Sequence, residues 1–186
     1  PLQTLVLPAK QKRLPQFIYW GSSLPASDDC IALAAAHALD VTGGMLDTNP
    51  DLSICPEASQ SFPGQPGLIC RDALGRVLRP EFRFVKDLAQ GQNLCLTYAD
   101  EDLGLTYEAH FELTASSNIL TCWSRLEATQ PLMLNWLAAP VFPATQLSDA
   151  MISFSGRWIG EFQTQPIPWR AGIHKRESRT GRSGHE

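Results

Sequence analysis

Apolar and polar residues alternate along much of the second half of the chain. From Leu105 to Thr114, apolar side chains occupy every second position, and polar side chains such as His110 lie between them. This period of two predicts a β-strand with one buried face. The same alternation recurs, with turn sequences between the runs, at residues 94–98, 120–126 and 132–138. The pattern predicts an antiparallel meander, and a second layer must cover its apolar face, which indicates a β-sandwich.

The first half of the chain predicts fewer regular elements. Residues 2–7 and 16–20 are short runs typical of strands. The Ala-rich run Cys30–Leu39 predicts a short helix, because Ser27–Asp29 in front of it offers an N-cap. The stretch Val41–Gly67 is rich in Gly and Pro and predicts an ordered loop or a set of turns. Loops of this length are usually functional or interfacial.

The C-terminal part predicts one more pair of strands. Residues 154–169 have the pattern of a strand, a turn and a second strand, and a basic run punctuated by Gly follows as far as Glu186. A self-contained domain rarely ends in such a run, so we expect the chain to be the front portion of a longer protein. We assign residues 1–170 to a β-sandwich domain and residues 171–186 to the start of a linker.

The composition fits a folded domain with a sizeable core. Hydrophobic residues make up 44% of the chain and charged residues 18%. The predicted fold class is therefore mainly β, a large antiparallel β-sandwich with a short N-terminal helix. The net charge of −4 argues against a nucleic-acid partner. No apolar run reaches the roughly 18 residues that a membrane-spanning helix needs, so we expect no membrane partner.

The cysteines indicate the compartment. There are five of them, widely spaced and without a C-x-x-C pair. This pattern is typical of free thiols in a reducing compartment, so we expect a cytoplasmic protein.

The sequence offers few candidates for chemistry. The acidic residues Asp100–Asp102 lie in a predicted hairpin turn, where adjacent side chains diverge, so we interpret them as solvated rather than as a calcium or acid–base site. The four histidines lie far apart, and none forms an H-x-x-x-H pair. His110 is interpreted as a polar surface residue. We therefore expect no catalytic residue, no metal and no cofactor in this chain.

Aromatic residues have two interpretations. Trp136 and Trp158 are in phase with other apolar residues, which predicts that they belong to the core. Phe62 and Asp47 lie in the long Gly- and Pro-rich loop, and for these both a core or capping role and a sugar-contact role stay open.

Four sets of short strings make the chain resemble the N-terminal domain of the family 36 glycoside hydrolases, the α-galactosidase and raffinose-processing group. Together they cover nearly the whole chain, and the last, similar to the family's G-R-W-x-x-E and G-R-x-S-H run, is the most specific. The strings are Phe17–Gly21; Gly43–Asp47 with Leu52–Glu57 and Phe62–Leu68; Leu103–Leu105 with the meander through Pro140; and Phe154–Trp158 with Glu161 and Arg179–His185.

The resemblance implies both a fold and a parent enzyme. The fold would be a β-supersandwich of the galactose-mutarotase-like kind, followed by a catalytic (β/α)₈ barrel. That barrel would carry the aspartate nucleophile and the aspartate acid/base of a retaining mechanism. The chain itself would be a catalytically silent N-terminal domain of an α-galactosidase that hydrolyses terminal α-galactosides. Its partners would be the barrel of its own chain or of a neighbouring subunit in a homo-oligomer.

The resemblance also suggests substrate-binding residues. By position, the loop from Asp47 to Leu68 corresponds to a family loop that helps to shape the galactose subsite. We therefore predict Asp47, Phe62 and Arg71 as substrate-binding residues. Without the barrel, the face that packs on it would be exposed, so we also expect an apolar patch on the isolated chain. The alternative is a stand-alone carbohydrate-binding or adaptor β-sandwich with no enzyme attached.

Overall fold

The structure is a computed structural model that describes residues 2–8, 12–37, 52–144, 148–157, 159–170 and 172–177. Within it the chain forms two compact units, Pro1–Pro143 and Ala144–Glu186, and each is described by itself.

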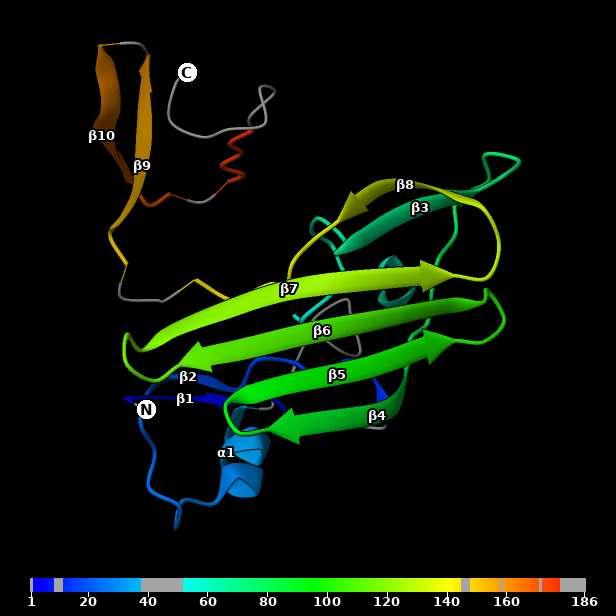
Figure 1. The fold of residues 1–186 in the computed structure, drawn as a ribbon, viewed down its shortest axis with the longest axis horizontal. Helices are drawn as coiled ribbons and strands as arrows, with labels where there is room; N and C mark the ends of the chain where they lie inside the picture. Colours follow the sequence, from blue (N-terminus) through cyan, green and yellow to red (C-terminus); the bar gives the residue numbers. More distant parts are fainter. Residues whose placement is uncertain are drawn as a thin grey trace, which may run out of the picture. The chain divides into compact units, whose positions relative to one another are not determined.

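A four-stranded antiparallel sheet dominates the first unit (Figure 1). Its order follows the sequence, because each strand is joined to the next by a short turn. The alternation seen in the sequence holds in space: Tyr107 and Ala109 of the third strand are fully buried on the inner face, whereas His110 lies on the outer face. The predicted meander is therefore confirmed, with one further strand in front of it. The strands are β4 (Arg83–Gln90), β5 (Asn93–Asp100), β6 (Leu105–Thr114) and β7 (Ile119–Ala128).

Shorter strands supply the other elements of this unit. Strands β1 (Gln3–Val6) and β2 (Tyr19–Ser22) form one antiparallel pair, and β3 (Leu68–Asp72) and β8 (Leu132–Leu137) form another. Strand β8 follows β7 in the chain but pairs with β3 instead of extending the meander (Figure 1). The period of two predicted that β8 is a strand and could not reveal its partner.

The hydrophobic core lies on the inner face of the four-stranded sheet. Tyr98 and Tyr107 are fully buried there, and the ring of Phe82 lies 5.5 Å from that of Tyr107. Apolar residues from β1, from the loop before β3 and from β8 pack against them. Burial of large side chains from both sides of the core is the main stabilising term of such a sandwich. The predicted mainly β fold with antiparallel sheets is confirmed.

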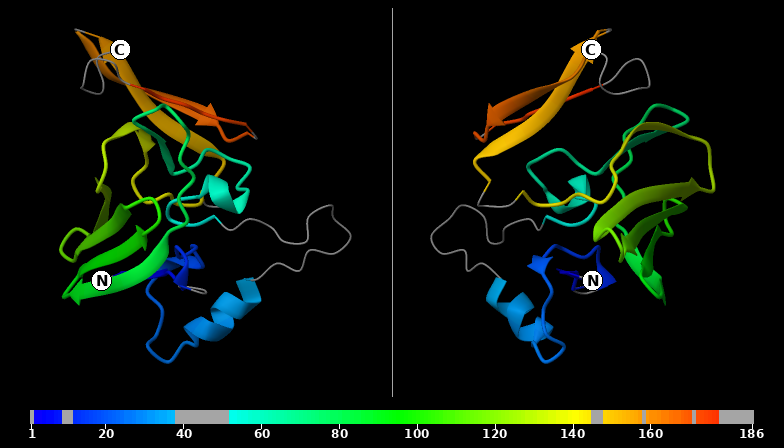
Figure 2. Two further views of the ribbon diagram at one scale, coloured as in Figure 1. Left: turned by 90° about the vertical axis from the view of Figure 1, so that its right-hand side faces the viewer. Right: turned by 60° about the vertical axis from the view of Figure 1, so that its left-hand side comes forward.

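The predicted helix is present and capped. Helix α1 (Cys30–His37) begins after Asp29, whose Oδ1 accepts hydrogen bonds from the backbone N–H groups of Ile31 at 2.9 Å and Ala32 at 3.0 Å. These bonds satisfy two of the unpaired donors of the first turn. Most of its side chains are exposed, and it stands outside the sheets (Figure 2). In the described ranges, no helix is long and apolar enough to span a bilayer.

The second unit is a β-hairpin followed by an irregular tail. Strand β9 (Ala150–Arg157) pairs antiparallel with β10 (Gly160–Pro168), with a register shift near the turn. This confirms the strand, turn and strand predicted for the segment. Trp158 and the basic run from residue 178 onward lie outside the described residues.

Candidate functional site

The second half of the long loop is held by backbone hydrogen bonds on both sides. The N–H of Ile54 donates to the carbonyl of Pro15 at 3.0 Å, and its carbonyl accepts from the N–H of Val141 at 2.9 Å. Farther along, the N–H of Ala138 donates to the carbonyl of Gly67 at 2.8 Å. The predicted ordered loop or set of turns is present in the described part of the stretch, residues 52–67, which contain the short 3₁₀ helix η2 (Ala58–Gln60).

Glu57 connects this loop to the sheet. Its Oε1 accepts a hydrogen bond from the backbone N–H of Phe82 at 2.7 Å. Burial raises the pKa of the Glu57 carboxyl to about 7, although that hydrogen bond and the charges of Arg13 and Arg83 act in the opposite direction. Burial, with the nearby charge of Glu57, also raises the pKa of the Cys55 thiol to about 12. The carboxyl group of Glu57 thus anchors the loop to the segment before β4, and its burial favours the protonated form.

The structure describes two of the three predicted substrate-binding residues, Phe62 and Arg71. Asp47 lies outside the described residues. Phe62 is half-buried, and its ring packs so closely over Gly64 that a Cβ on this glycine would lie 2.6 Å from the ring. Arg71 donates from Nη1 to the carbonyl of Gly75 at 2.9 Å and so closes its own turn. Between the described pair, no hydrogen bond, ion pair or ring contact joins Phe62 to Arg71.

The acidic turn after β5 is structural rather than fully solvated. The carboxylate of Asp100 is buried and accepts hydrogen bonds from the backbone N–H groups of Glu81 at 2.8 Å and Leu103 at 3.0 Å. Asp100 therefore fixes the turn and ties it to the segment before β4, which corrects the interpretation of this residue as solvated. Glu101 and Asp102 flank an open hollow of about 800 Å³ that Arg79 also lines.

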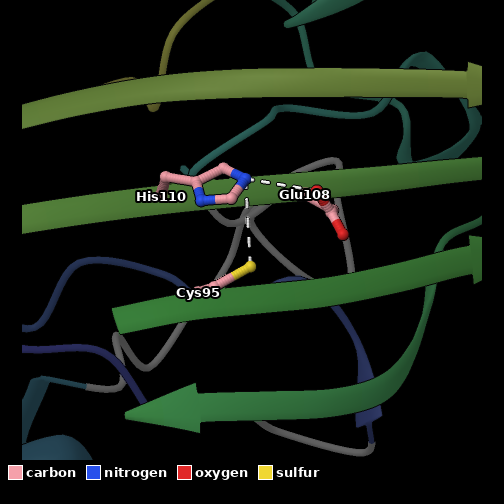
Figure 3. Close-up of side chains that lie close together, drawn as sticks. All are labelled: Cys95, Glu108 and His110. Atoms are coloured by element: carbon pink, nitrogen blue, oxygen red, sulfur yellow. Dashed lines mark hydrogen bonds and ion pairs between the residues drawn. The ribbon is translucent and has the colours of Figure 1, made fainter. Parts of the chain in front are cut away.

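A polar cluster lies on the outer face of the four-stranded sheet (Figure 3). His110 of β6 lies directly opposite Cys95 of β5, and Nε2 of His110 is 3.9 Å from Sγ of Cys95. The same nitrogen is 3.2 Å from Oε2 of Glu108, two residues earlier on β6. The ligand atoms of these three side chains all lie within 4.8 Å of one another. We call Cys95, Glu108 and His110 the outer-face cluster.

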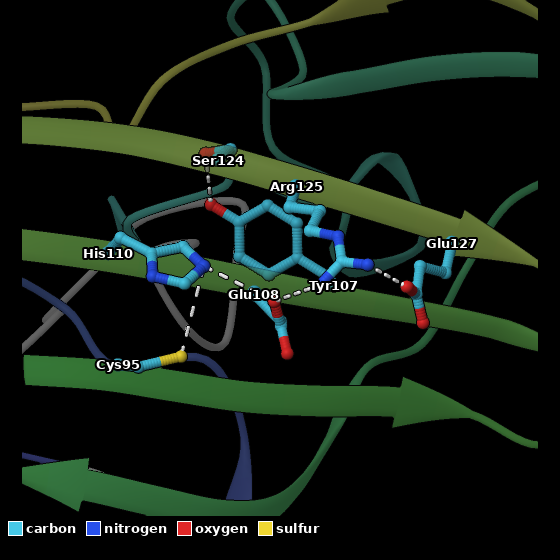
Figure 4. Close-up of polar contacts among 7 residues, drawn as sticks. All are labelled: Cys95, Tyr107, Glu108, His110, Ser124, Arg125 and Glu127. Atoms are coloured by element: carbon cyan, nitrogen blue, oxygen red, sulfur yellow. Dashed lines mark hydrogen bonds and ion pairs between the residues drawn. The ribbon is translucent and has the colours of Figure 1, made fainter.

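Side chains on β7 contact the outer-face cluster, and Figure 4 shows one of them, Arg125, beside Glu108. The ring of Trp123 stacks on that of His110, with centroids 4.9 Å apart and planes 4° apart. Nη1 of Arg125 is 3.5 Å from Oε2 of Glu108, and its Nη2 donates to Glu127. Tyr107 does not belong to this cluster, because its side chain lies on the inner face of the sheet. Its hydroxyl forms a hydrogen bond with the Ser124 hydroxyl at 3.0 Å.

Sequence reasoning placed His110 on the outward face but missed this cluster. The spacing of histidines along the chain gave no metal signal, because the second ligand comes from the neighbouring strand. The cross-strand register of β5 and β6, which pairs Cys95 with His110, is the signal that could have found it.

Large apolar side chains are also exposed along β8. Met133 is 54% exposed, Leu134 49% and Trp136 44%. The prediction that Trp136 belongs to the core is therefore wrong. It is in phase with apolar neighbours, but β8 pairs only with the short strand β3, so no second layer covers this ring within the described part of the first unit.

Comparison with known proteins identifies the family of this chain. The model of the glycosyl hydrolase family 36 N-terminal domain matches residues 13–186. The chain belongs to this family. It is 28% identical over 177 residues to an α-galactosidase of Escherichia coli, covering 92% of this chain and 24% of that protein.

Solved structures share the fold. The α-galactosidase AgaA A355E of Geobacillus stearothermophilus, in complex with 1-deoxygalactonojirimycin, superposes with a TM-score of 0.77 at 17% identity, over 99% of this chain and 30% of that one. AgaB of the same organism gives a TM-score of 0.72 at 19% identity, over 100% and 28%. An α-galactosidase of Lactobacillus brevis gives 0.75 at 13% identity, over 91% and 26%. The chain thus spans about a quarter to a third of the length of each relative.

Proposed function

We propose that this chain is the non-catalytic N-terminal domain of an α-galactosidase, in which it packs against a catalytic barrel. The match to the family 36 N-terminal domain over residues 13–186 carries this proposal. The chain covers 24% of the matched α-galactosidase of Escherichia coli, which leaves the greater part of that protein for other domains. The parent protein would hydrolyse terminal α-galactosides with retention, through two carboxylates of the barrel.

The exposed apolar residues of β8 are the surface that we propose for this packing. Met133 and Trp136 pair with Arg71 and Ile69, which lie on one face of the β3–β8 pair, and both are about half exposed. Large apolar side chains gathered on a surface usually mark a contact with another body. The occupant that we propose is the barrel, of the same chain or of a neighbouring subunit in a homo-oligomer. The wide spacing of five cysteines, all free thiols, supports a cytoplasmic location for the parent.

We also propose that the loop from Asp47 to Leu68 contributes to the wall of the galactose subsite. The half-buried ring of Phe62 has a rigid support, because residues 52–67 are anchored on both sides. A fixed aromatic ring can stack on the apolar face of a sugar. Alanine at Asp47, Phe62 or Arg71 in the parent should then raise KM. Unchanged KM and kcat in all three variants would remove this proposal.

The test of the proposed function compares hydrolysis of p-nitrophenyl α-galactoside by the parent and by the 186-residue chain. Activity in the parent and none in the chain is the expected result. Inactivity of both, with galactosides still bound by the chain, would overturn it and favour a stand-alone carbohydrate-binding sandwich. The open hollow beside Arg79 and Asp102 would then be the first place to look for the sugar.

A further inference from the structure

The geometry of the outer-face cluster is close to that of a tetrahedral metal site. With zinc–ligand distances of roughly 2.0 to 2.3 Å, ligand atoms on one tetrahedral zinc lie about 3.4 to 3.6 Å apart. Nε2 of His110 is 3.2 Å from the carboxylate oxygen of Glu108 and 3.9 Å from the sulfur of Cys95. Shifts of a few tenths of an ångström would bring both pairs to the metal-bound separations. The third pair, Sγ of Cys95 and a carboxylate oxygen of Glu108, lies within 4.8 Å and needs a shift of at most about 1.2 Å.

The direction of the side chains favours a metal over a nucleophilic triad. In a triad, the base uses one ring nitrogen for the nucleophile and the other for the orienting carboxylate. Here Cys95 and Glu108 both face the same nitrogen of His110, and the second ring nitrogen lies on the other edge of the ring (Figure 3). Three ligand atoms that converge on one point are the arrangement that a metal ion requires.

The chemistry of the three ligands selects the metal. A thiolate, an imidazole and a carboxylate together suit Zn²⁺, which accepts sulfur, nitrogen and oxygen ligands in tetrahedral geometry. We infer that Cys95, Glu108 and His110 bind a zinc ion on the outer face of the sheet, with water as the fourth ligand. This site differs from the sequence-based expectation of no metal, and it does not depend on the proposed enzymatic role of the parent.

The surroundings give the ligands a fixed orientation. The exposed fraction of the side chain is 23% for His110 and 19% for Glu108, so both are half-buried although they lie on the outer face. The stacked ring of Trp123 fixes the plane of the imidazole. Ligands that are already oriented lose less conformational entropy when the metal binds.

The positive charge of Arg125 opposes the binding of a metal ion, and this effect can be tested. Its guanidinium group is 3.5 Å from the Glu108 carboxylate, where it competes with a cation for the same oxygen. The ion pair of Arg125 with Glu127 keeps this charge next to the outer-face cluster. By Coulomb's law in water, a unit charge roughly 6 Å from a divalent ion weakens binding about tenfold. Arg125→Gln should therefore tighten metal binding about tenfold.

The test is titration of the protein with Co²⁺ alone, which substitutes for Zn²⁺ and is visible by absorption. The expected result is a sulfur-to-cobalt charge-transfer band that saturates at one ion per chain and disappears when Zn²⁺ is added. Cys95→Ser and His110→Gln should each weaken binding by more than about 100-fold, since even loss of a supporting residue costs about 10- to 100-fold. Cys30→Ser, which removes an exposed thiol of α1, is the matched control and should keep the band.

Several outcomes would overturn the site. The inference fails if no charge-transfer band forms, if the band survives in Cys95→Ser, or if it is lost in Cys30→Ser. Arg125→Gln retains all three ligands, so it tests the site even where a ligand variant fails to fold. Unchanged or weaker Co²⁺ affinity in a folded Arg125→Gln variant would also contradict the inference.

Discussion

At the scale of single residues, the carboxyl group of Glu57 couples stability to pH. Its pKa is raised to about 7 by burial, from an ordinary value of 4.5. The folded state therefore holds this proton more tightly than the unfolded chain does. The resulting stabilisation is fully present below pH 4.5 and is lost as the pH rises through 7.

The prediction for Glu57 follows from this shift. Between pH 5 and pH 8, the free energy of unfolding of the chain should fall by about 2 kcal/mol through this group. Glu57→Gln stays neutral and can still accept the hydrogen bond of Phe82, so it should remove that part of the pH dependence. Urea unfolding at both pH values measures it. Glu112→Gln, at an exposed carboxylate of β6, is the control that should keep the wild-type dependence. A Glu57→Gln variant with the full slope would refute the assignment.

Sequence patterns predicted which strand residues face outward or inward, but not which residues of the neighbouring strands they contact. His110 was placed on the outward face because its neighbours on the strand alternate. Its contacts with Cys95 and Trp123 arise from the registers of β6 with β5 and with β7, which no local pattern contains. The prediction that Trp136 belongs to the core was wrong for a related reason. A residue can be in phase with apolar neighbours although no second layer packs over its side chain.

At the scale of elements, glycines with left-handed backbone close tight turns of the first unit, and Gly75 and Gly104 are two of them. Gly104 has φ +62°, and a Cβ there would lie 2.1 Å from the Thr129 hydroxyl oxygen. Gly75 has φ +80°, and a Cβ there would meet no other atom within 4 Å. Both glycines thus need a positive φ, and they differ in whether a Cβ would meet a neighbouring atom.

Alanine at each glycine separates the two effects. Gly75→Ala should cost about 1 kcal/mol of unfolding free energy, the usual cost of left-handed backbone for a residue with a Cβ. Gly104→Ala should cost about 2 to 3 kcal/mol, because Thr129 must also move. Urea titration of both variants measures the difference. Equal losses would show that the contact with Thr129 relaxes without cost.

Most elements could be predicted because they are local. The helix followed from an Ala-rich run after an acidic cap, and the strands β5 to β7 followed from their period of two. The pairing of β3 with β8 could not be predicted, because it joins residues far apart in the chain whose alternation looks like that of any other strand. Of the predicted site, Phe62 and Arg71 were found in separate local contacts, and Asp47 stays a prediction outside the described residues.

At the scale of the whole molecule, the apolar surface of β8 predicts how the chain behaves without a barrel. We expect the isolated chain to self-associate at high concentration, because Met133 and Trp136 are about half exposed on one face of the β3–β8 pair. Met133→Asp should shift it towards the monomer in sedimentation. Ile31→Asp, at an 83% exposed position of α1, is the control that should leave association unchanged. A wild-type chain that stays strictly monomeric would count against this surface as a docking face.

The backbone bonds of Ile54 also set an order of events during synthesis. Ile54 joins Pro15 on one side and Val141 on the other, so its second partner is made long after it. At about 5 to 20 residues per second, the ribosome reaches Val141 roughly 4 to 17 seconds after Ile54. By then every strand of the meander has been translated. The loop that carries Phe62 therefore cannot complete its backbone hydrogen bonds until the whole meander has been synthesised.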